Sequence, residues 1–178
     1  AEDGILNVWV ISDRLKAVKG KLDIRVMDLK GSVLFTKNSN ITLPANTSKI
    51  QFSAPIESLV AGKNLNEVVV NARFTENGKE SEVISNNYFF TRYKDIDFPK
   101  ADIQMTSVPA GDGFDVTVQS DVFARAVFLS IDGIDNFFSD NYFDLLPNEP
   151  VTIHVTTELD KDSFDKQLKY QSIVDAYN

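Results

Sequence analysis

The side chains that could carry out chemistry are few. The chain of 178 residues contains no Cys and one His, so disulfide frameworks, thiolate metal sites and two-histidine zinc sites are excluded. A Ser-His-Asp triad would depend on His154 alone, and no sequence motif places a Ser beside it. His154 falls on the polar face of its strand-like run and is interpreted as a surface histidine. Without a glycine-rich phosphate loop, a nucleophile elbow or metal-ligand spacing, the sequence predicts no catalytic residue, no metal and no cofactor.

The densest group of acidic and aromatic residues spans residues 132–144. Carboxylates at such density suggest an oxygen-ligand calcium site, or a carboxylate pair for glycoside chemistry. The spacing does not fit an EF-hand, because no Gly stands at the sixth position and no Glu at the twelfth. We favour an inter-strand turn with solvated carboxylates and with Phe137, Phe138 or Phe143 packed inward.

Three aromatic residues are candidates for contact with a sugar ring: Trp9, Phe138 and Tyr142. Such a role requires exposed aromatic faces, so it fails for any of these side chains that is buried. For Trp9 the competing interpretation is a core residue, because a lone Trp in an early strand is more often buried.

Alternation of apolar and polar residues dominates the chain and predicts strands with one buried face. The runs lie near residues 5–11, 22–26, 50–54, 68–74, 114–118, 151–155 and 170–177. Asn77-Gly78 predicts a type I′ hairpin turn, and only residues 55–61 and 160–166 suggest short helical turns. The predicted fold is all-β: two consecutive immunoglobulin-like antiparallel β-sandwich domains.

The charge distribution supports two domains, at residues 1–97 and 98–178. The first range carries 13 Lys and Arg against 12 Asp and Glu, and the second carries 5 against 14, which together give the net charge of −8. The junction at 94–100 is charged and contains Pro99. This acidic balance argues against nucleic acid as a partner, and no apolar run is long enough to cross a membrane as a helix. Strand-like runs at both ends of the chain suggest an excised piece of a longer protein.

The sequence resembles the C-terminal β-sandwich domains of β-mannosidases, which are family 2 glycoside hydrolases. The resemblance rests on residues 9–15 (WVISDRL), 20–22, 28–31, 87–90 and 94–100, and on 138–150 (FSDNYFDLLPNEP). It covers essentially the whole chain. A Gly is common in this family where Asn148 stands here, a difference that affects turn geometry only.

The resemblance implies a parent enzyme that hydrolyses terminal β-mannosides with two glutamates in a (β/α)₈ barrel. Nothing in this chain corresponds to that barrel, so no catalytic residue is carried over. The expected role is a non-catalytic accessory module whose partner is the rest of the parent polypeptide, with an apolar patch on one face. The alternative is an independent carbohydrate-binding module, whose partner would be an oligosaccharide. A periplasmic or extracellular location is favoured for the parent.

Overall fold

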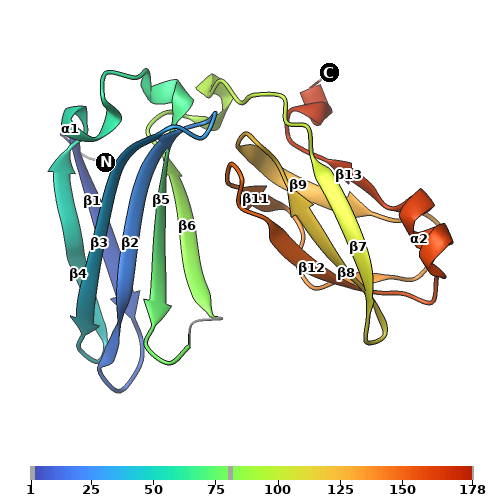
Figure 1. The fold of residues 1–178 in the computed structure, drawn as a ribbon. Helices are drawn as coiled ribbons and strands as arrows, with labels where there is room; N and C mark the ends of the chain where they lie inside the picture. Colours follow the sequence, from blue (N-terminus) through green and yellow to red (C-terminus); the bar gives the residue numbers. More distant parts are fainter. Residues whose placement is uncertain (1–2, 80–81, 178) are drawn as a thin grey trace. The chain divides into compact units, whose positions relative to one another are not determined.

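The computed structural model describes residues 3–79 and 82–177 and forms two compact units. The first unit comprises residues 1–28 and 32–97, and the second comprises residues 29–31 and 98–178 (Figure 1). Each unit is described by itself. Within the described ranges, no helix is sufficiently long and apolar to cross a bilayer.

The first unit is an antiparallel sandwich of two unequal sheets. One sheet has the strand order β1-β4 and the other β3-β2-β5-β6 (Figure 1). The strands are β1 (Ile5–Ser12), β2 (Val18–Asp28), β3 (Val33–Leu43), β4 (Thr47–Pro55), β5 (Val68–Glu76) and β6 (Val83–Phe89). Helix α1 (Glu57–Val60) and the 3₁₀ turns η1 (Leu65–Glu67) and η2 (Tyr93–Asp95) complete the unit.

The core of the first unit follows directly from the alternation in the sequence. Leu22, Ile24 and Val26 of β2 are buried and pack with Val68 and Val70 of β5. The intervening residues of β2 point to the other face, because successive side chains of a strand alternate. Burial of these aliphatic side chains supplies the main stabilisation of the sandwich.

The second unit is also an antiparallel sandwich, with strand orders β10-β12-β8-β7 and β11-β9-β13. Its strands are β7 (Gln104–Ala110), β8 (Gly113–Gln119), β9 (Ala124–Ser130), β10 (Phe137–Phe138), β11 (Phe143–Leu145), β12 (Val151–Thr156) and β13 (Lys169–Gln171). Helix α2 (Lys161–Gln167) lies near the end of the chain, before the 3₁₀ turn η3 (Asp175–Tyr177).

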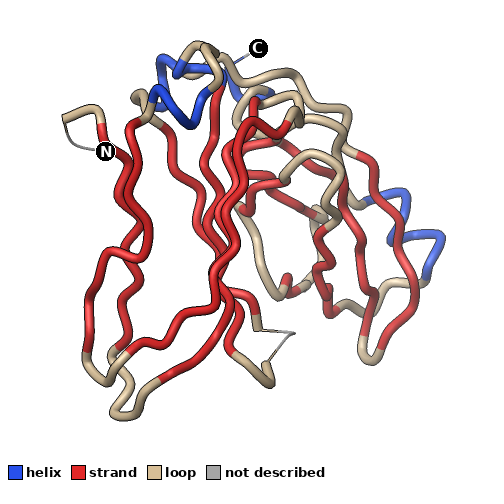
Figure 2. Tube along the Cα trace, turned by 60° about the vertical axis from the view of Figure 1, so that its left-hand side comes forward, coloured by secondary structure: helices blue, strands red, loops and turns tan. Residues whose placement is uncertain are grey.

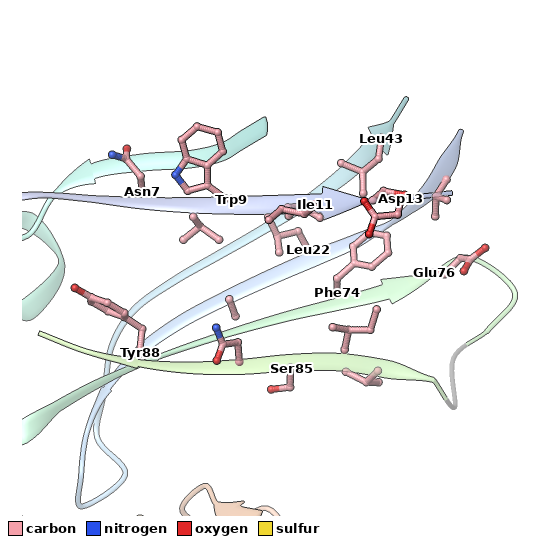
Figure 3. A pocket seen from close by; sticks show the side chains of 18 of the residues that line it. Asn7, Trp9, Ile11, Asp13, Leu22, Leu43, Phe74, Glu76, Ser85 and Tyr88 are labelled. Carbon is pink, nitrogen blue, oxygen red and sulfur yellow. The ribbon is translucent and has the colours of Figure 1, made fainter. Parts of the chain in front are cut away.

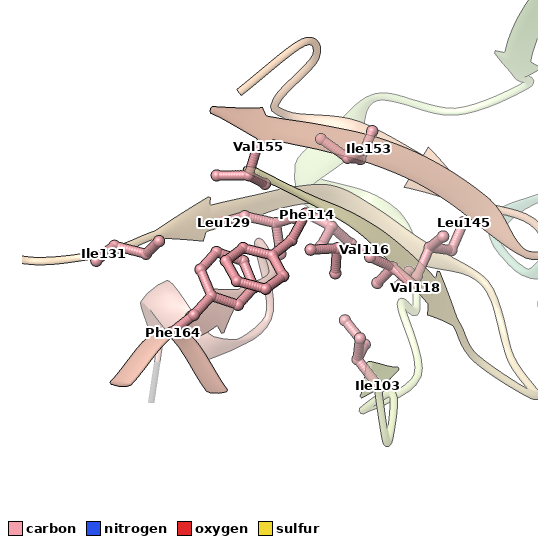
Figure 4. Packing of buried hydrophobic residues seen from close by; sticks show 12 residues of the cluster. Ile103, Phe114, Val116, Val118, Leu129, Ile131, Leu145, Ile153, Val155 and Phe164 are labelled. Carbon is pink, nitrogen blue, oxygen red and sulfur yellow. The ribbon is translucent and has the colours of Figure 1, made fainter. Parts of the chain in front are cut away.

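Helix α2 inserts an aromatic ring into the core of the second unit. The ring of Phe164 is fully buried and stacks on Phe114 of β8, with ring centroids 4.2 Å apart (Figure 4). Asp160 caps the helix, since its carboxylate accepts a hydrogen bond from the backbone N–H of Ser163 at 2.9 Å.

The predicted all-β architecture is confirmed, and strands and their loops make up most of the chain (Figure 2). Short helices also form within the two ranges expected to contain helical turns. The prediction of a strand over 170–177 is wrong beyond Gln171, where the chain ends in a 3₁₀ turn.

The prediction of a hairpin at Asn77-Gly78 is correct, because β5 and β6 pair there, but the predicted turn type, I′, is wrong. Thr75 pairs with Val83, so the connection is longer than two residues. The N–H of Lys79 donates to the carbonyl of Glu76 at 3.0 Å, and of the two central residues only Gly78 has positive φ. Positive φ at the second central residue alone is typical of a type II turn.

Candidate functional site

An apolar groove of about 760 Å³ lies between β1 and β6 of the first unit (Figure 3). Within residues 3–79 and 82–177, each of these strands pairs with one strand of its sheet, so each presents an edge that no described strand covers. The walls carry Trp9 and Ile11 from β1 and Tyr88 from β6, and Leu22 and Phe74 lie at the floor.

Trp9 lies at the rim of the groove with 55% of its surface exposed. Val8 and Val10 pack towards the core, and a register irregularity lies between Val8 and Trp9. The interpretation of Trp9 as a core residue is therefore wrong. The alternation of the flanking valines was the sequence signal that places Trp9 on the outer face.

Polar groups gather at one end of the groove. Asp13 and Glu76 lie there (Figure 3), and the guanidinium of Arg14 forms an ion pair with the Glu76 carboxylate at 3.0 Å. Asn7 lies on β1 beside Trp9, away from that end of the groove. An exposed indole with a neighbouring amide can stack on a sugar ring and hydrogen-bond its hydroxyls.

The other two predicted sugar-contact residues, Phe138 and Tyr142, belong to the second unit. Phe138 is partly buried against the core of that unit. Tyr142 is 67% exposed, and its ring stacks on Phe128 with centroids 4.8 Å apart. The backbone of Tyr142 has φ of 60°, directly after Asn141, whose side chain bonds both the N–H and the carbonyl of Leu129. Of Phe138 and Tyr142, only Tyr142 therefore has the exposure that contact with a sugar ring requires.

The acidic segment 132–144 forms turns and short strands whose carboxylates bind the protein itself. Asp144 pairs with the guanidinium of Arg125 at 2.5 Å and accepts from the N–H of Ala126 at 3.0 Å. Asp132 pairs with Lys169 at 2.6 Å. Phe143 and Phe138 pack against the core, in keeping with the expectation that Phe137, Phe138 or Phe143 packs inward, whereas Phe137 is 68% exposed. Among residues 3–79 and 82–177, no group of three His, Asp or Glu side chains could hold a metal ion.

His154 of β12 lies between two carboxylates that the sequence analysis did not connect with it. Its Nδ1 is 2.8 Å from Asp115 Oδ1 and its Nε2 is 3.0 Å from Asp112 Oδ1. The hydrogen bond to Asp115, and then that to Asp112, raise the pKa of His154 above its usual value. The same contact with His154 lowers the pKa of Asp112. The sequence analysis missed this contact because it depends on the pairing of β12 with β8, which places Asp115 directly opposite His154.

These features define the class of protein: two β-sandwich units, with exposed aromatic side chains and an apolar groove in the first. Comparison with family models then identifies the family. Residues 4–95 match the mannosidase Ig/CBM-like domain, and residues 98–176 match an Ig-fold domain of mannosidases. The chain belongs to the mannosidase Ig/CBM-like family. The resemblance noted in the sequence is thereby confirmed.

Solved structures show the same fold. The β-D-mannosidase of Dictyoglomus thermophilum superposes with a TM-score of 0.81 at 19% identity, over 97% of this chain and 21% of that one. The exo-chitosanase CsxA of Amycolatopsis orientalis gives a TM-score of 0.56 at 15% identity, over 96% of this chain and 24% of that one. The chain therefore spans about a fifth to a quarter of these proteins. A comparison with curated protein sequences found no match.

Proposed function

We propose that this chain is the C-terminal, non-catalytic accessory region of a β-mannosidase-like glycoside hydrolase, and that it packs against the catalytic barrel of the parent. The observation that carries the proposal is the succession of two mannosidase-associated domain matches over 4–95 and 98–176. The β-D-mannosidase from Dictyoglomus thermophilum supports it, since a region with this fold forms 21% of a chain with that name. The domain boundary that we propose lies between Asp97 and Phe98.

The chemistry of the described side chains favours an accessory role. A retaining glycosidase holds two carboxyl groups about 5–5.5 Å apart across a sugar-sized cleft. In the groove, the Glu76 carboxylate is engaged by Arg14. In the second unit, Asp144 and Asp132 are engaged by Arg125 and Lys169. Carboxylates paired with cations in this way stabilise loops, whereas a retaining glycosidase needs one carboxyl group that can donate a proton to the leaving group.

The test compares residues 1–178 with the full-length polypeptide on p-nitrophenyl β-D-mannoside. We expect hydrolysis by the full-length protein and none by residues 1–178. Removal of residues 1–178 from the full-length protein should lower its melting temperature, because the barrel then exposes the surface that these domains cover. Turnover by residues 1–178 alone, or an unaltered melting temperature after their removal, would refute the accessory role.

A second candidate function is sugar binding by the first unit, which the exposure of Trp9 at an apolar groove favours. Binding of a mannan-derived oligosaccharide would place a pyranose ring on the indole face, with Asn7 in reach of its hydroxyls. Tyr142 on its Phe128 support is the corresponding candidate in the second unit. Loss of saturable binding in Trp9→Ala but not in Tyr142→Ala would assign the site to the first unit.

A further inference from the structure

The groove between β1 and β6 arises because the two sheets of the first sandwich differ in width. The β1-β4 sheet has two strands, and it faces a sheet of four. Phe52 of β4 packs on Phe35 of β3 with ring centroids 5.6 Å apart, and Val8 and Val10 of β1 pack on the central core. The narrow sheet thus covers one side of the wide sheet, and β6 lies at its uncovered end.

The register shows that β6 directs apolar side chains towards the interior side. Ile84 pairs with Phe74, and Tyr88 pairs with Val70. Directly opposed residues of neighbouring strands lie on the same face of the sheet, and Phe74 and Val70 are both core residues. Ile84 therefore lies on the core face, yet 70% of its surface is exposed. An isoleucine on the core face with this exposure lacks a neighbour from the opposite sheet.

We propose that a seventh β-strand fills this groove, pairs with the free edge of β1 and covers Ile84 and Tyr88. In an immunoglobulin-type sandwich the first strand, A, lies beside strand B in the sheet that also contains strand E. By their pairing, β1 and β4 correspond to B and E, and β2, β5 and β6 correspond to C, F and G. β3 pairs with β2, so it takes the place of strand C′ of a variable-type sandwich and not that of strand D. The groove beside β1 is the position of strand A.

The occupant is a segment of the same polypeptide that precedes residue 1, an assignment that rests on the proposed function. Strand A comes before strand B along the chain and runs antiparallel to it, so a short hairpin at the Ile5 end of β1 can join them. In the β-D-mannosidase that matches this fold, four-fifths of the chain lies outside the matched region. The groove selects an extended segment with apolar residues at alternate positions, because Ile84, Leu22 and Phe74 face it.

The test uses a single cysteine, which the absence of natural Cys in these residues allows. Ile84→Cys is introduced into residues 1–178, and into the same chain extended by the preceding natural segment of about 15 residues, enough for one strand and its hairpin. Maleimide labelling of residue 84 is followed by mass spectrometry of its peptide. Val33→Cys on β3 is the matched control, since Val33 is exposed at the other edge of the same sheet and does not line the groove.

We expect the extension to slow labelling of Cys at position 84 by about tenfold or more, because a covered thiol reacts only during local opening. Labelling at position 33 should not change. Equal rates at position 84 in the two chains would overturn the proposal. Slow labelling already in residues 1–178 that becomes fast on dilution would overturn it too, because a second copy would then occupy the groove. Circular dichroism of each variant verifies the fold, and neither result depends on mannosidase activity.

Discussion

At the scale of single residues, His154 makes the stability of the fold depend on pH. Both ring nitrogens face carboxylates, Asp115 at 2.8 Å and Asp112 at 3.0 Å. Both nitrogens can donate at once only in the imidazolium form. The contact links β12 to β8 and to the turn that precedes β8. It adds to two bonds with Ser139, whose N–H donates to the carbonyl of His154 and whose hydroxyl accepts from the N–H of His154.

The pKa of His154 is raised, chiefly by its hydrogen bond to Asp115. A group whose pKa is higher in the folded than in the unfolded state stabilises the fold fully below its unfolded pKa of about 6.5. That stabilisation is lost as the pH rises through the folded-state pKa. We therefore expect the difference in unfolding free energy between the natural protein and His154→Gln to be larger at about pH 5.5 than at about pH 8.5. Urea denaturation at both pH values measures it.

A nuclear magnetic resonance titration provides the control, because the chain has one His. Asp115→Asn should lower the pKa of His154, since it removes the carboxylate whose hydrogen bond contributes most to the increase. A His154 pKa at or below the ordinary value in the natural protein would contradict this account.

The prediction for Trp9 failed because residue type was given more weight than alternation. The outward position of Trp9 follows from Val8 and Val10, although its residue type suggested the core. The contact of His154 with Asp112 and Asp115 was not predictable in the same way. Residues 112 and 154 meet only after β8 and β12 pair, and the sequence does not specify which strands pair.

At the scale of elements, helix α2 stabilises the second unit chiefly through one side chain, Phe164. Phe164 is fully buried and stacked on Phe114, whereas Phe137 is a phenylalanine of the same unit with a largely exposed ring. We expect Phe164→Ala to destabilise the second unit by about 3–5 kcal/mol, because it leaves a cavity in the core. Phe137→Ala should change stability by no more than about 0.5 kcal/mol.

Urea denaturation of the two alanine variants measures this contrast. The same atoms are deleted in both, and the helix propensity of Ala favours Phe164→Ala over Phe137→Ala, so a larger loss at Phe164 reports on its burial. Equal destabilisation by the two substitutions would show that the core assignment of Phe164 is wrong.

Most elements could be predicted because each strand carries its own period-two pattern. The strands around Leu22, Val70 and Val116 were found in this way. The end of the chain was not, because residues 172–177 contain apolar positions that also suit a 3₁₀ turn. There the carboxylate of Asp175 accepts hydrogen bonds from the N–H and hydroxyl of Ser172 at 2.8 Å, and such local bonds compete with strand pairing.

At the scale of the whole molecule, the two halves are both β-sandwiches but differ in charge. Residues 1–97 carry 13 basic and 12 acidic side chains, and residues 98–178 carry 5 and 14. The segment between η2 and β7 has no regular structure and contains the exposed Lys100. We propose that the halves are separate domains joined there.

A specific protease site inserted after Lys100 tests this proposal. After cleavage, both fragments should keep their circular dichroism, since each unit has a core of its own. The C-terminal fragment should bind an anion exchanger much more tightly than the nearly neutral N-terminal one. Loss of β-structure from either fragment on cleavage would contradict two independent domains.

The most direct measurement of the central claim is isothermal titration of residues 1–178 with manno-oligosaccharides, with Trp9→Ala and Tyr142→Ala as matched variants. A non-catalytic region that packs on its parent's barrel predicts no saturable heat with any of the three proteins. Saturable binding that is lost in Trp9→Ala or in Tyr142→Ala would contradict this claim, and the chain would then be a carbohydrate-binding module that uses its exposed aromatic side chains.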